Sequence, residues 1–332
     1  MAKNASGDLE SDSPATWRPL LRVLAQVGAS LGVTVRPIGG GWMAELVKGS
    51  ERRLLHGYQL ELNAASAAAI ATDKAAAFDV LGALGLAAVP HRVFLHPRLS
   101  GYAPEGGNWG DMLKHFEGLG RDVVLKDNSG TGGMGVYRVQ SERALEACTY
   151  RLFQRAHGLA IAPFVVIDRE VRVIVLDGAP MVAIEKHRPS VTGDGVSSLR
   201  TLIERGVTAS MAERIGYTDP DLLAELEDVI PTGARRLLNW RHNVGQGTTP
   251  RPLNLTDAGV AVVLKGACEA AAGLRVRFAS VDMVEVGGQW MVLEVNAGVM
   301  MDGLMRLVPE GEALAETVYA AALERMFRSE TQ

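Results

Sequence analysis

The chain has 332 residues, of which 47% are hydrophobic and only 5% aromatic, and its formal net charge at pH 7 is −4. A chain of this length and aliphatic content can form two or three packed subdomains, which excludes an intrinsically disordered protein. The negative charge, without an arginine-rich or aromatic-rich stretch, argues against a nucleic-acid partner. No run of about 18 apolar residues is present, so neither a transmembrane helix nor a membrane partner is predicted.

The chain contains two cysteines, Cys148 and Cys268. They are too few for a disulfide framework and lack the spacing of a metal site, so both are expected to be buried, reduced thiols. The first residues, MAKNASGDLESDSP, lack the apolar core of a signal peptide. The sequence therefore predicts a cytoplasmic protein with a disordered leader over residues 1–14.

The first structured segment, residues 15–70, is expected to form a small α/β domain. Apolar residues at helical spacing, among them Leu24 and Val27, predict a helix over residues 16–31. A strand is expected to begin at Val33.

The next elements are delimited by capping and turn residues. Asp73 is placed to cap a helix over residues 75–84, and residues 89–95 are expected to form a strand. A loop rich in glycine and proline follows at residues 99–110. Further along the chain, Ser141 can cap another helix.

Residues 123–139 lie between the two predicted helix caps. They are expected to form an apolar strand that ends on Lys126, a loop, and a second strand that reaches Val139. Glycines in the loop lack Cβ atoms, so the backbone can approach a polyphosphate and donate its amides to the phosphate oxygens. These glycines are Gly130, Gly132, Gly133 and Gly135. The loop is neither a Walker A sequence nor a Rossmann fingerprint, and a glycine-rich hairpin without a ligand is the alternative.

The second half of the chain alternates strands and helices. Residues 164–176 and 180–186 are expected to form a strand pair around a short turn. Residues 199–238 are expected to be largely helical, and residues 256–274 to form a helix.

Residues 280–296 (SVDMVEVGGQWMVLEVN) are expected to form two strands joined by a turn at Gly287-Gly288. This hairpin brings three oxygen-bearing side chains to one end of a sheet: Asp282, Glu294 and Asn296. Strand alternation points the apolar neighbours Leu293 and Val295 to the opposite face. Oxygen ligands in an incomplete protein cage suit Mg²⁺. An ordinary hairpin with polar residues on its wet face is the alternative.

Several motifs occur in the order in which they are found in the ATP-grasp superfamily. Residues 71–74 (ATDK) and 85–90 (GLAAVP) resemble the opening of its nucleotide domain. Residues 170–178 (EVRVIVLDG), 191–196 (VTGDGV) and 241–249 (RHNVGQGTT) are similar to the carboxylate-amine ligase branch, particularly cyanophycin synthetases and ribosomal-protein glutamate ligases. The resemblance covers most of the chain.

This resemblance implies an α+β protein with an ATP-grasp fold, in which two α+β subdomains hold ATP between them. The small N-terminal α/β domain would precede them and contribute to the substrate side. Residues 71–160 would form the central subdomain with the glycine-rich loop, and residues 161–330 the C-terminal subdomain with the metal site. A homodimer is also suggested by the resemblance alone.

The resemblance also implies roles for individual residues. Asp282, Glu294 and Asn296 would hold two Mg²⁺ ions, or Mn²⁺ in their place, that bridge the ATP phosphates. Arg241 and Lys126 are the residues expected to be catalytic: Arg241 would bind the transferring phosphoryl group or the acyl phosphate, and Lys126 would hold ATP. The residues expected to bind ATP are Lys74, Lys126, Ser129, Gly132, Gly133, Met134, Gly135, Pro163, Phe164, Val166, Glu170, Arg172 and Lys186. Among them, Glu170 would contact the ribose hydroxyls.

The sequence departs from the family's pattern at three places. The hinge at residues 161–166 lacks an acidic residue, so adenine recognition is expected to rest on backbone groups. Ser280 stands where many related ligases have an arginine before the first metal carboxylate, and Arg241 is expected to supply that charge. After Asn296 the usual proline and glycine are replaced by AGVMMD, which makes the substrate-facing loop unusual.

The predicted activity is an ATP-dependent ligation of a carboxylate to an amine through an acyl phosphate, releasing ADP and phosphate. The compact length favours amino acids or short peptides as substrates, in specialised metabolism by analogy. Lys186, His187 and Arg188 are candidates for contacting substrate or ATP, with a solvated turn as the alternative. No histidine is named as catalytic. A kinase acting on a hydroxyl and a non-catalytic ATP-binding protein remain alternatives. Replacing Asp282 by Asn, or Glu294 by Gln, is expected to abolish turnover and leave the fold intact.

Overall fold

The computed structural model describes residues 14–102, 109–133, 135–206, 220–242 and 247–328. The chain divides into two units, residues 1–62 with 298–332 and residues 63–297. No helix among the described residues is long and apolar enough to span a membrane.

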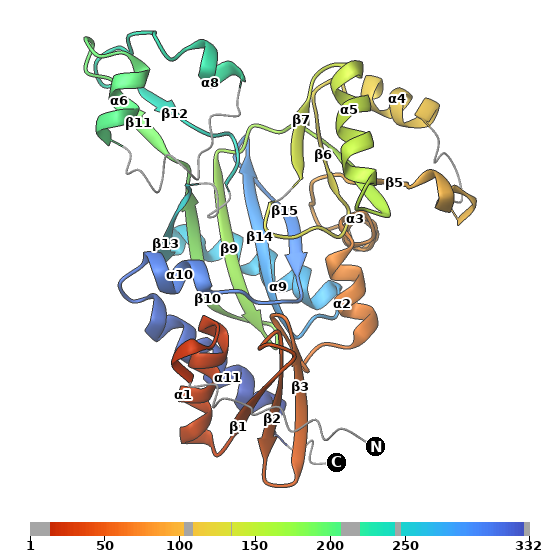
Figure 1. The fold of residues 1–332 in the computed structure, drawn as a ribbon, viewed down its shortest axis with the longest axis vertical. Helices are drawn as coiled ribbons and strands as arrows, with labels where there is room; N and C mark the ends of the chain where they lie inside the picture. Colours follow the sequence, from red (N-terminus) through yellow and green to blue (C-terminus); the bar gives the residue numbers. More distant parts are fainter. Residues whose placement is uncertain (1–13, 103–108, 134, 207–219, 243–246, 329–332) are drawn as a thin grey trace, which may run out of the picture. The chain divides into compact units, whose positions relative to one another are not determined.

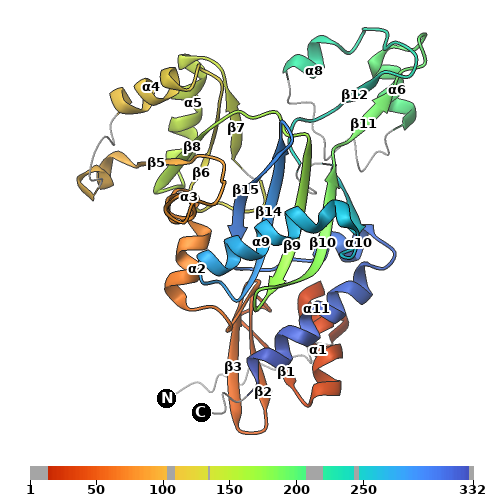
Figure 2. The same ribbon diagram turned by 180° about the vertical axis from the view of Figure 1, so that it is seen from behind.

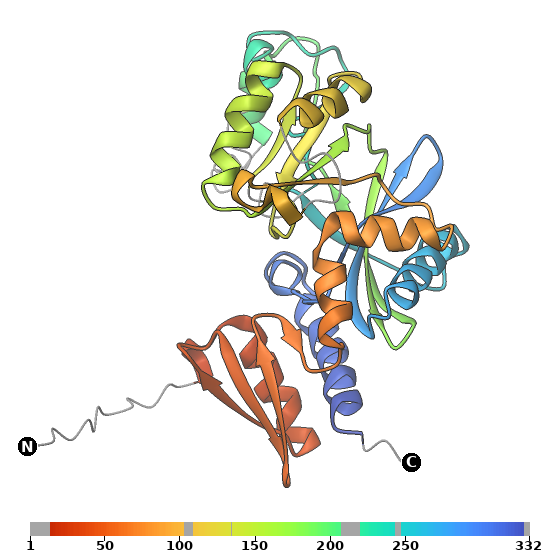
Figure 3. The same ribbon diagram turned by 90° about the vertical axis from the view of Figure 1, so that its right-hand side faces the viewer.

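The first unit contains a four-stranded antiparallel sheet in the order β1-β2-β3-β4. Helix α1 lies against one face of this sheet and packs on helix α11 (Figure 3). The helix begins at a proline, and its buried stripe includes Leu20, Leu21 and Leu24, as the apolar spacing predicts. The elements of this unit are η1 (Pro14–Thr16), α1 (Pro19–Leu31), β1 (Thr34–Ile38), β2 (Met43–Lys48), β3 (Glu51–His56), β4 (Gln59–Leu60), α10 (Asp302–Leu307) and α11 (Gly311–Met326).

A hydrogen bond between Tyr58 and Asp302 joins the two ends of the chain within this unit. The Tyr58 hydroxyl donates to Asp302 Oδ2 at 2.6 Å. Burial, and secondarily the Asp302 carboxylate, raises the pKa of Tyr58 to about 12.

Tyr58→Phe is expected to lower the free energy of unfolding by about 1 kcal/mol at neutral pH, because this hydrogen bond is lost. Since the folded-state pKa lies above the ordinary value, the neutral phenol favours the folded state below pH 10, and its contribution is lost as pH rises from 10 to 12. Urea titrations of both proteins between pH 8 and 11 should show the difference shrinking at the alkaline end. A constant difference would contradict the assignment.

The second unit contains two larger sheets and a small two-stranded one. Its helices are α2 (Ala65–Thr72), α3 (Lys74–Ala83), η2 (Pro97–Tyr102), α4 (Trp109–Gly118), α5 (Glu142–Phe153), α6 (Leu199–Gly206), α8 (Pro220–Ala224), η4 (Ala258–Val260) and α9 (Ala261–Gly273). Its strands are β5 (Arg92–Leu95), β6 (Val123–Asp127), β7 (Val136–Val139), β8 (Gly158–Pro163), β9 (Arg169–Leu176), β10 (Ala179–His187), β11 (Ser190–Thr192), β12 (Arg235–Leu237), β13 (Thr249–Leu253), β14 (Phe278–Val286) and β15 (Gln289–Asn296).

The larger sheet is antiparallel throughout, in the order β13-β10-β9-β14-β15 (Figure 1). Helix α9 lies across one face of it (Figure 2), where alternate residues such as Val171, Val173 and Val281 form a buried core. The intervening residues, among them Arg172 and Asp282, therefore stand on the opposite face. The candidate functional site described below is built from polar and charged side chains on this second face.

The second sheet has the order β5-β8-β6-β7, and every pair in it is antiparallel. One face carries a core that includes Phe94, Leu125 and Ile161. The alternate residues of the same strands, among them Lys126, face the other way. A small lobe made of β11, β12, α6 and α8 has a separate apolar core.

Several predicted elements are confirmed and others are corrected. Asp73 and Ser141 both cap helices, and the hairpins at β6–β7 and β14–β15 form as expected. The strand predicted over residues 164–176 begins only at residue 169, as β9, and residues 164–168 connect it to β8. Helix α4 begins at Trp109, inside the segment predicted as a loop. The segment 199–238 is helical only in part, because it also contributes strand β12.

Candidate functional site

The hairpin β14–β15 places Asp282 directly opposite Glu294 in the strand register. Asn296 Nδ2 donates to Glu294 Oε1 at 3.1 Å, so all three predicted metal ligands lie at one end of the hairpin. The turn is tight, with positive φ at Gly287 and at Gly288.

The predicted orientation of Leu293 is wrong. The register shifts between Asp282 and Met283, which leaves Leu293 as an extra residue on β15. Leu293 therefore packs with Val89 on the same face as Glu294, whereas Val295 lies in the opposite core as predicted.

Asp282 is the centre of a buried network of opposite charges. Its carboxylate accepts hydrogen bonds from Arg172 Nε at 2.8 Å and from Arg172 Nη2 at 2.7 Å. Lys186 Nζ donates to Asp282 Oδ1 at 2.9 Å. Asp282 is only 2% exposed, and burial alone would raise its pKa, but Arg172 and Lys186 hold the pKa well below its usual range.

Glu170 extends this network on strand β9. Its Oε1 accepts a hydrogen bond from Lys186, and its Oε2 lies 3.5 Å from Nδ1 of His242. Burial raises the pKa of Glu170, although Lys186 opposes this shift. Burial lowers the pKa of His242 to about 3, so this imidazole is neutral at physiological pH.

Two more lysines approach the hairpin from other elements. Lys74, the first residue of α3, donates to the backbone carbonyl of Gly130 at 2.6 Å and lies 3.9 Å from Glu294 Oε2. Lys126 is 7% exposed, and burial lowers its pKa to about 8, with Glu294 opposing the shift. The contact of Lys74 with Gly130 ties the glycine-rich loop to helix α3.

The glycine-rich loop adopts a backbone that requires glycine. Gly132, Gly133 and Gly135 have φ values of 72°, 69° and 66°. The amide of Ser129 donates to Asp127 Oδ1, and a Cβ atom at Gly130 would come within 2.8 Å of the Asp127 side chain. Met134 lies outside the described residues.

Gly135→Ala is expected to destabilise the protein more than Gly132→Ala. Both positions have positive φ, which costs about 1–2 kcal/mol for alanine. At Gly135 the new methyl would also lie 2.9 Å from Cδ2 of the fully buried Leu152, whereas nothing lies within 4 Å at Gly132. The Arg155 Nη2 atom, 2.2 Å away, is the end of an exposed side chain that can move aside. Overpacking adds about 1–3 kcal/mol. Denaturant titrations that gave equal losses would contradict this packing.

The predicted hinge contributes an aromatic cluster around Phe164. The Phe164 ring lies 3.7 Å from the Arg138 guanidinium carbon and 5.6 Å from the Trp240 ring at an interplanar angle of 73°. The Phe164 amide donates to Asp122 O at 2.9 Å. Pro163 ends strand β8, and Val166 is exposed.

Arg241 is placed beside the glycine-rich strands. Its Nη2 donates to the Val136 carbonyl at 2.6 Å, and its guanidinium lies over the Trp240 ring. Part of the motif at residues 241–249 falls outside the described residues.

The basic trio at the end of β10 separates into three environments. Lys186 belongs to the buried network. His187 Nε2 lies 3.2 Å from Glu185 Oε2, and Arg188 Nη2 donates to the Ile167 carbonyl. The trio therefore supplies one member of the charge network.

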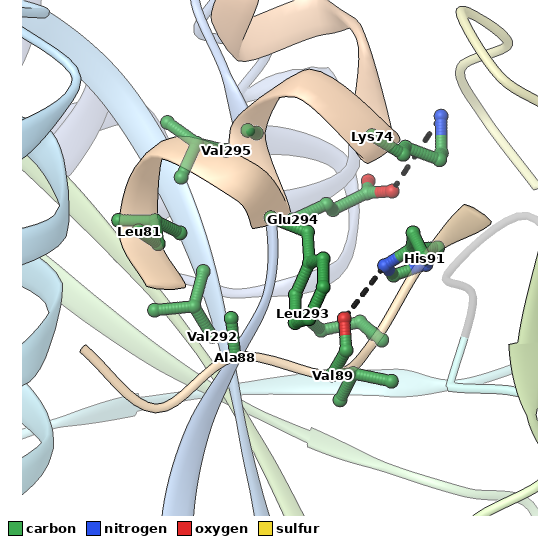
Figure 4. A pocket seen from close by; sticks show the side chains of 11 residues that line it. Lys74, Leu81, Ala88, Val89, His91, Val292, Leu293, Glu294 and Val295 are labelled. Carbon is green, nitrogen blue, oxygen red and sulfur yellow. Dashed lines mark hydrogen bonds and ion pairs between the residues drawn. The ribbon is translucent and has the colours of Figure 1, made fainter. Parts of the chain in front are cut away.

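One residue of the site was missed by sequence reasoning. His91 is 5% exposed, and it lines a pocket together with Lys74, Glu294 and Leu293 (Figure 4). A signal was present, since Val89, His91 and Val93 occupy alternate positions of the strand predicted over residues 89–95.

Comparisons with known proteins bear on the fold. The structure of a bifunctional glutathione synthetase from Pasteurella multocida matches with a TM-score of 0.53 and 14% identity, over 92% of this chain and 44% of that one. The structure of D-alanine–D-alanine ligase from Bacillus anthracis matches with a TM-score of 0.52 and 17% identity, over 80% of this chain and 68% of that one. The chain has the ATP-grasp fold. The predicted fold class, and the resemblance to ATP-grasp ligases that implied it, are thus confirmed.

The sequence relationships of the chain are distant. The glutathione biosynthesis bifunctional protein of Lactiplantibacillus plantarum is 25% identical over 158 residues, which are 47% of this chain and 20% of that protein. The chain thus matches about a fifth of the length of this relative. No family model matches the chain.

The donor set of the hairpin fits a hard divalent cation. Asp282, Glu294 and Asn296 offer only oxygen ligands, which Mg²⁺ prefers. Asn296 uses its amide nitrogen toward Glu294, which leaves its carbonyl oxygen for a ligand. Asp282 would have to share its oxygens with Arg172 and Lys186.

Proposed function

We propose that this chain is an ATP- and Mg²⁺-dependent carboxylate-amine ligase. The proposal rests on one observation: seven charged side chains lie together at one end of the two large sheets in an ATP-grasp fold. The cations are Lys74, Lys126, Arg172 and Lys186, and the anions are Glu170, Asp282 and Glu294. A local surplus of positive charge favours a polyphosphate, and the paired carboxylates favour its divalent cation.

In the proposed reaction, a carboxylate oxygen of the substrate attacks the γ-phosphorus of ATP, and the bond from that phosphorus to the β-phosphate oxygen breaks to release ADP. The amine then attacks the acyl carbon, inorganic phosphate leaves, and the nitrogen loses a proton to give the amide. Bound Mg²⁺ would reduce the repulsion between the two anions.

The chain's own residues would bind and orient the reactants. Lys74 and Lys126 would bind the phosphates, because both are delivered beside the glycine-rich loop. Glu170 would accept from the ribose hydroxyls, and Arg172 and Lys186 would hold Asp282 in place. Arg241, whose Nη2 donates to the Val136 carbonyl, would act on the phosphoryl group.

We further propose that the substrates are amino acids or short peptides, as the names glutathione synthetase and D-alanine–D-alanine ligase indicate for those two proteins. A cytoplasmic location is supported by Cys148 and Cys268, which are both free and half-buried.

The test is ADP release from Mg-ATP over a matrix of amino acids and short peptides, with hydroxylamine added to trap an acyl phosphate as a hydroxamate. We expect ADP only with particular carboxylates, together with hydroxamate or amide product. A phosphorylated acceptor without hydroxamate would replace the proposal by a kinase. ATP binding without turnover on any acceptor would leave only a nucleotide-binding protein.

A further inference from the structure

Asn128 lies where the second sheet, the glycine-rich loop and helix α3 meet. It follows the last residue of β6, and its amide donates to the Gly158 carbonyl at 3.1 Å, which extends the pairing of β6 with β8 by one residue. The residue is buried. The sheet thus fixes the backbone of Asn128, and its carbonyl group and side chain contact a different element.

That element is the first turn of α3. The Asn128 carbonyl oxygen accepts from the Lys74 amide at 3.2 Å, and Asn128 Oδ1 accepts from the Ala75 amide at 3.2 Å. The next amide, that of Ala76, donates to Asp73 Oδ1, and the Asp73 amide donates to carbonyls of α2. All four amides at the start of α3 that lack a partner within the helix are therefore bonded.

This arrangement determines how α3 can take part in phosphate binding. An open helix N-terminus can bind a phosphate through its amides, but in α3 these amides are used within the protein. The contribution of α3 must then come from the Lys74 side chain. Its Nζ donates to the Gly130 carbonyl at 2.6 Å and to the Asn128 carbonyl at 3.4 Å, beside Glu294 (Figure 4).

The Asn128 side chain makes one of these contacts, and only that one depends on the residue type. The bonds from its backbone to Gly158 and Lys74 would survive a substitution, whereas the bond from Oδ1 to the Ala75 amide would not. Its loss would leave a buried amide unsatisfied and free the first turn of α3 from the sheet. Because Lys74 directly precedes Ala75, its ammonium would no longer be held at one place beside the glycine-rich loop.

We infer that Asn128 is a positioning residue that holds Lys74 where its ammonium binds the phosphates of ATP. This inference rests on the proposed function, which gives Lys74 that role. Asn128 itself takes no part in the chemical steps. An asparagine suits this position because its amide oxygen accepts from Ala75 without placing a negative charge beside the phosphates, as an aspartate would.

The first test needs no nucleotide and follows amide hydrogen exchange at the start of α3 by NMR. In Asn128→Ala the Ala75 amide should exchange about tenfold faster, and in Asn128→Asp, which keeps an oxygen acceptor, it should stay protected. Asp73→Ala is the matched control, because it removes the other side-chain cap of the same turn and should speed exchange more at Ala76 than at Ala75. Unchanged exchange of Ala75 in Asn128→Ala would overturn the inference.

The second test is isothermal titration calorimetry of ATP binding in a double-mutant cycle. Asn128→Ala should weaken ATP binding about five- to tenfold, and Asn128→Asp at least as much because of its charge. In a Lys74→Met background, where Lys126 remains to bind the phosphates, adding Asn128→Ala should change the affinity by less than about twofold. Asp73→Ala should bind ATP within about twofold of wild type.

The outcomes separate this inference from the proposed function. A loss from Asn128→Ala that is as large in Lys74→Met as in wild type would mean that Asn128 does not act through Lys74. Equal weakening by Asp73→Ala would mean that any loss of a cap is sufficient. Either result would overturn the inference alone. A wild-type chain that binds no ATP would overturn the proposed function as well, and the exchange data would still show whether Asn128 holds α3.

Discussion

Asp282→Asn is expected to lower the free energy of unfolding by about 3–5 kcal/mol. The asparagine would keep the size of the side chain but remove the charge that two buried cations share, Arg172 through two hydrogen bonds and Lys186 through one. Breaking a buried pair from one side is costly because the remaining charges cannot be rehydrated. The expectation from sequence that this substitution leaves the fold intact therefore does not follow from the structure.

Urea titration of the purified variant would measure this loss. The matched control is Asp177→Asn, because Asp177 also receives two hydrogen bonds from one arginine, Arg277, but this pair is partly exposed. The control should cost less than about 1 kcal/mol. Equal losses in the two variants would mean that burial of the Asp282 network contributes nothing beyond an ordinary surface pair.

Features encoded by neighbouring residues were predictable from the sequence. Asp73 caps α3 by accepting from the Ala76 amide at 2.9 Å, and the Gly287-Gly288 turn closes the hairpin with positive φ at both residues. In each case the residue type and the geometry that requires it lie within four positions of one another. The glycine-rich loop was predictable for the same reason, because the positive φ values at Gly132 and Gly135 are a property of the glycines themselves.

Features that depend on distant partners were not predictable. The sequence grouped Arg172 and Lys186 with the nucleotide and Asp282 with the metal, but the structure joins all three in one network across 110 and 96 positions. Alternation indicates the face on which a side chain lies and not the neighbour that it meets. A single bulge was enough to turn Leu293 onto the face of Glu294.

Glu294 is a predicted metal ligand that, unlike Asp282, can be replaced at little expected cost in stability. Glu294→Gln is expected to lower kcat of the proposed ligase by about 10²–10³-fold. Its side chain is 23% exposed, and its only ion pair among the described residues is with Lys74 at 3.9 Å, so the loss of stability should stay below about 1 kcal/mol. The amide would keep the contact with Asn296 but would no longer attract a divalent cation.

The control for this variant is Glu285→Gln on the same hairpin. Glu285 is paired with Arg169 at 3.7 Å and is 22% exposed, so it matches Glu294 in burial and pairing, but it stands opposite Trp290 near the turn. Steady-state ADP release should be near wild type in Glu285→Gln and reduced in Glu294→Gln, with both proteins unfolding at similar urea concentrations. Because the two glutamates differ mainly in which end of the hairpin they occupy, wild-type kcat in Glu294→Gln would place the metal elsewhere, and equal losses would point to the hairpin's packing as the cause.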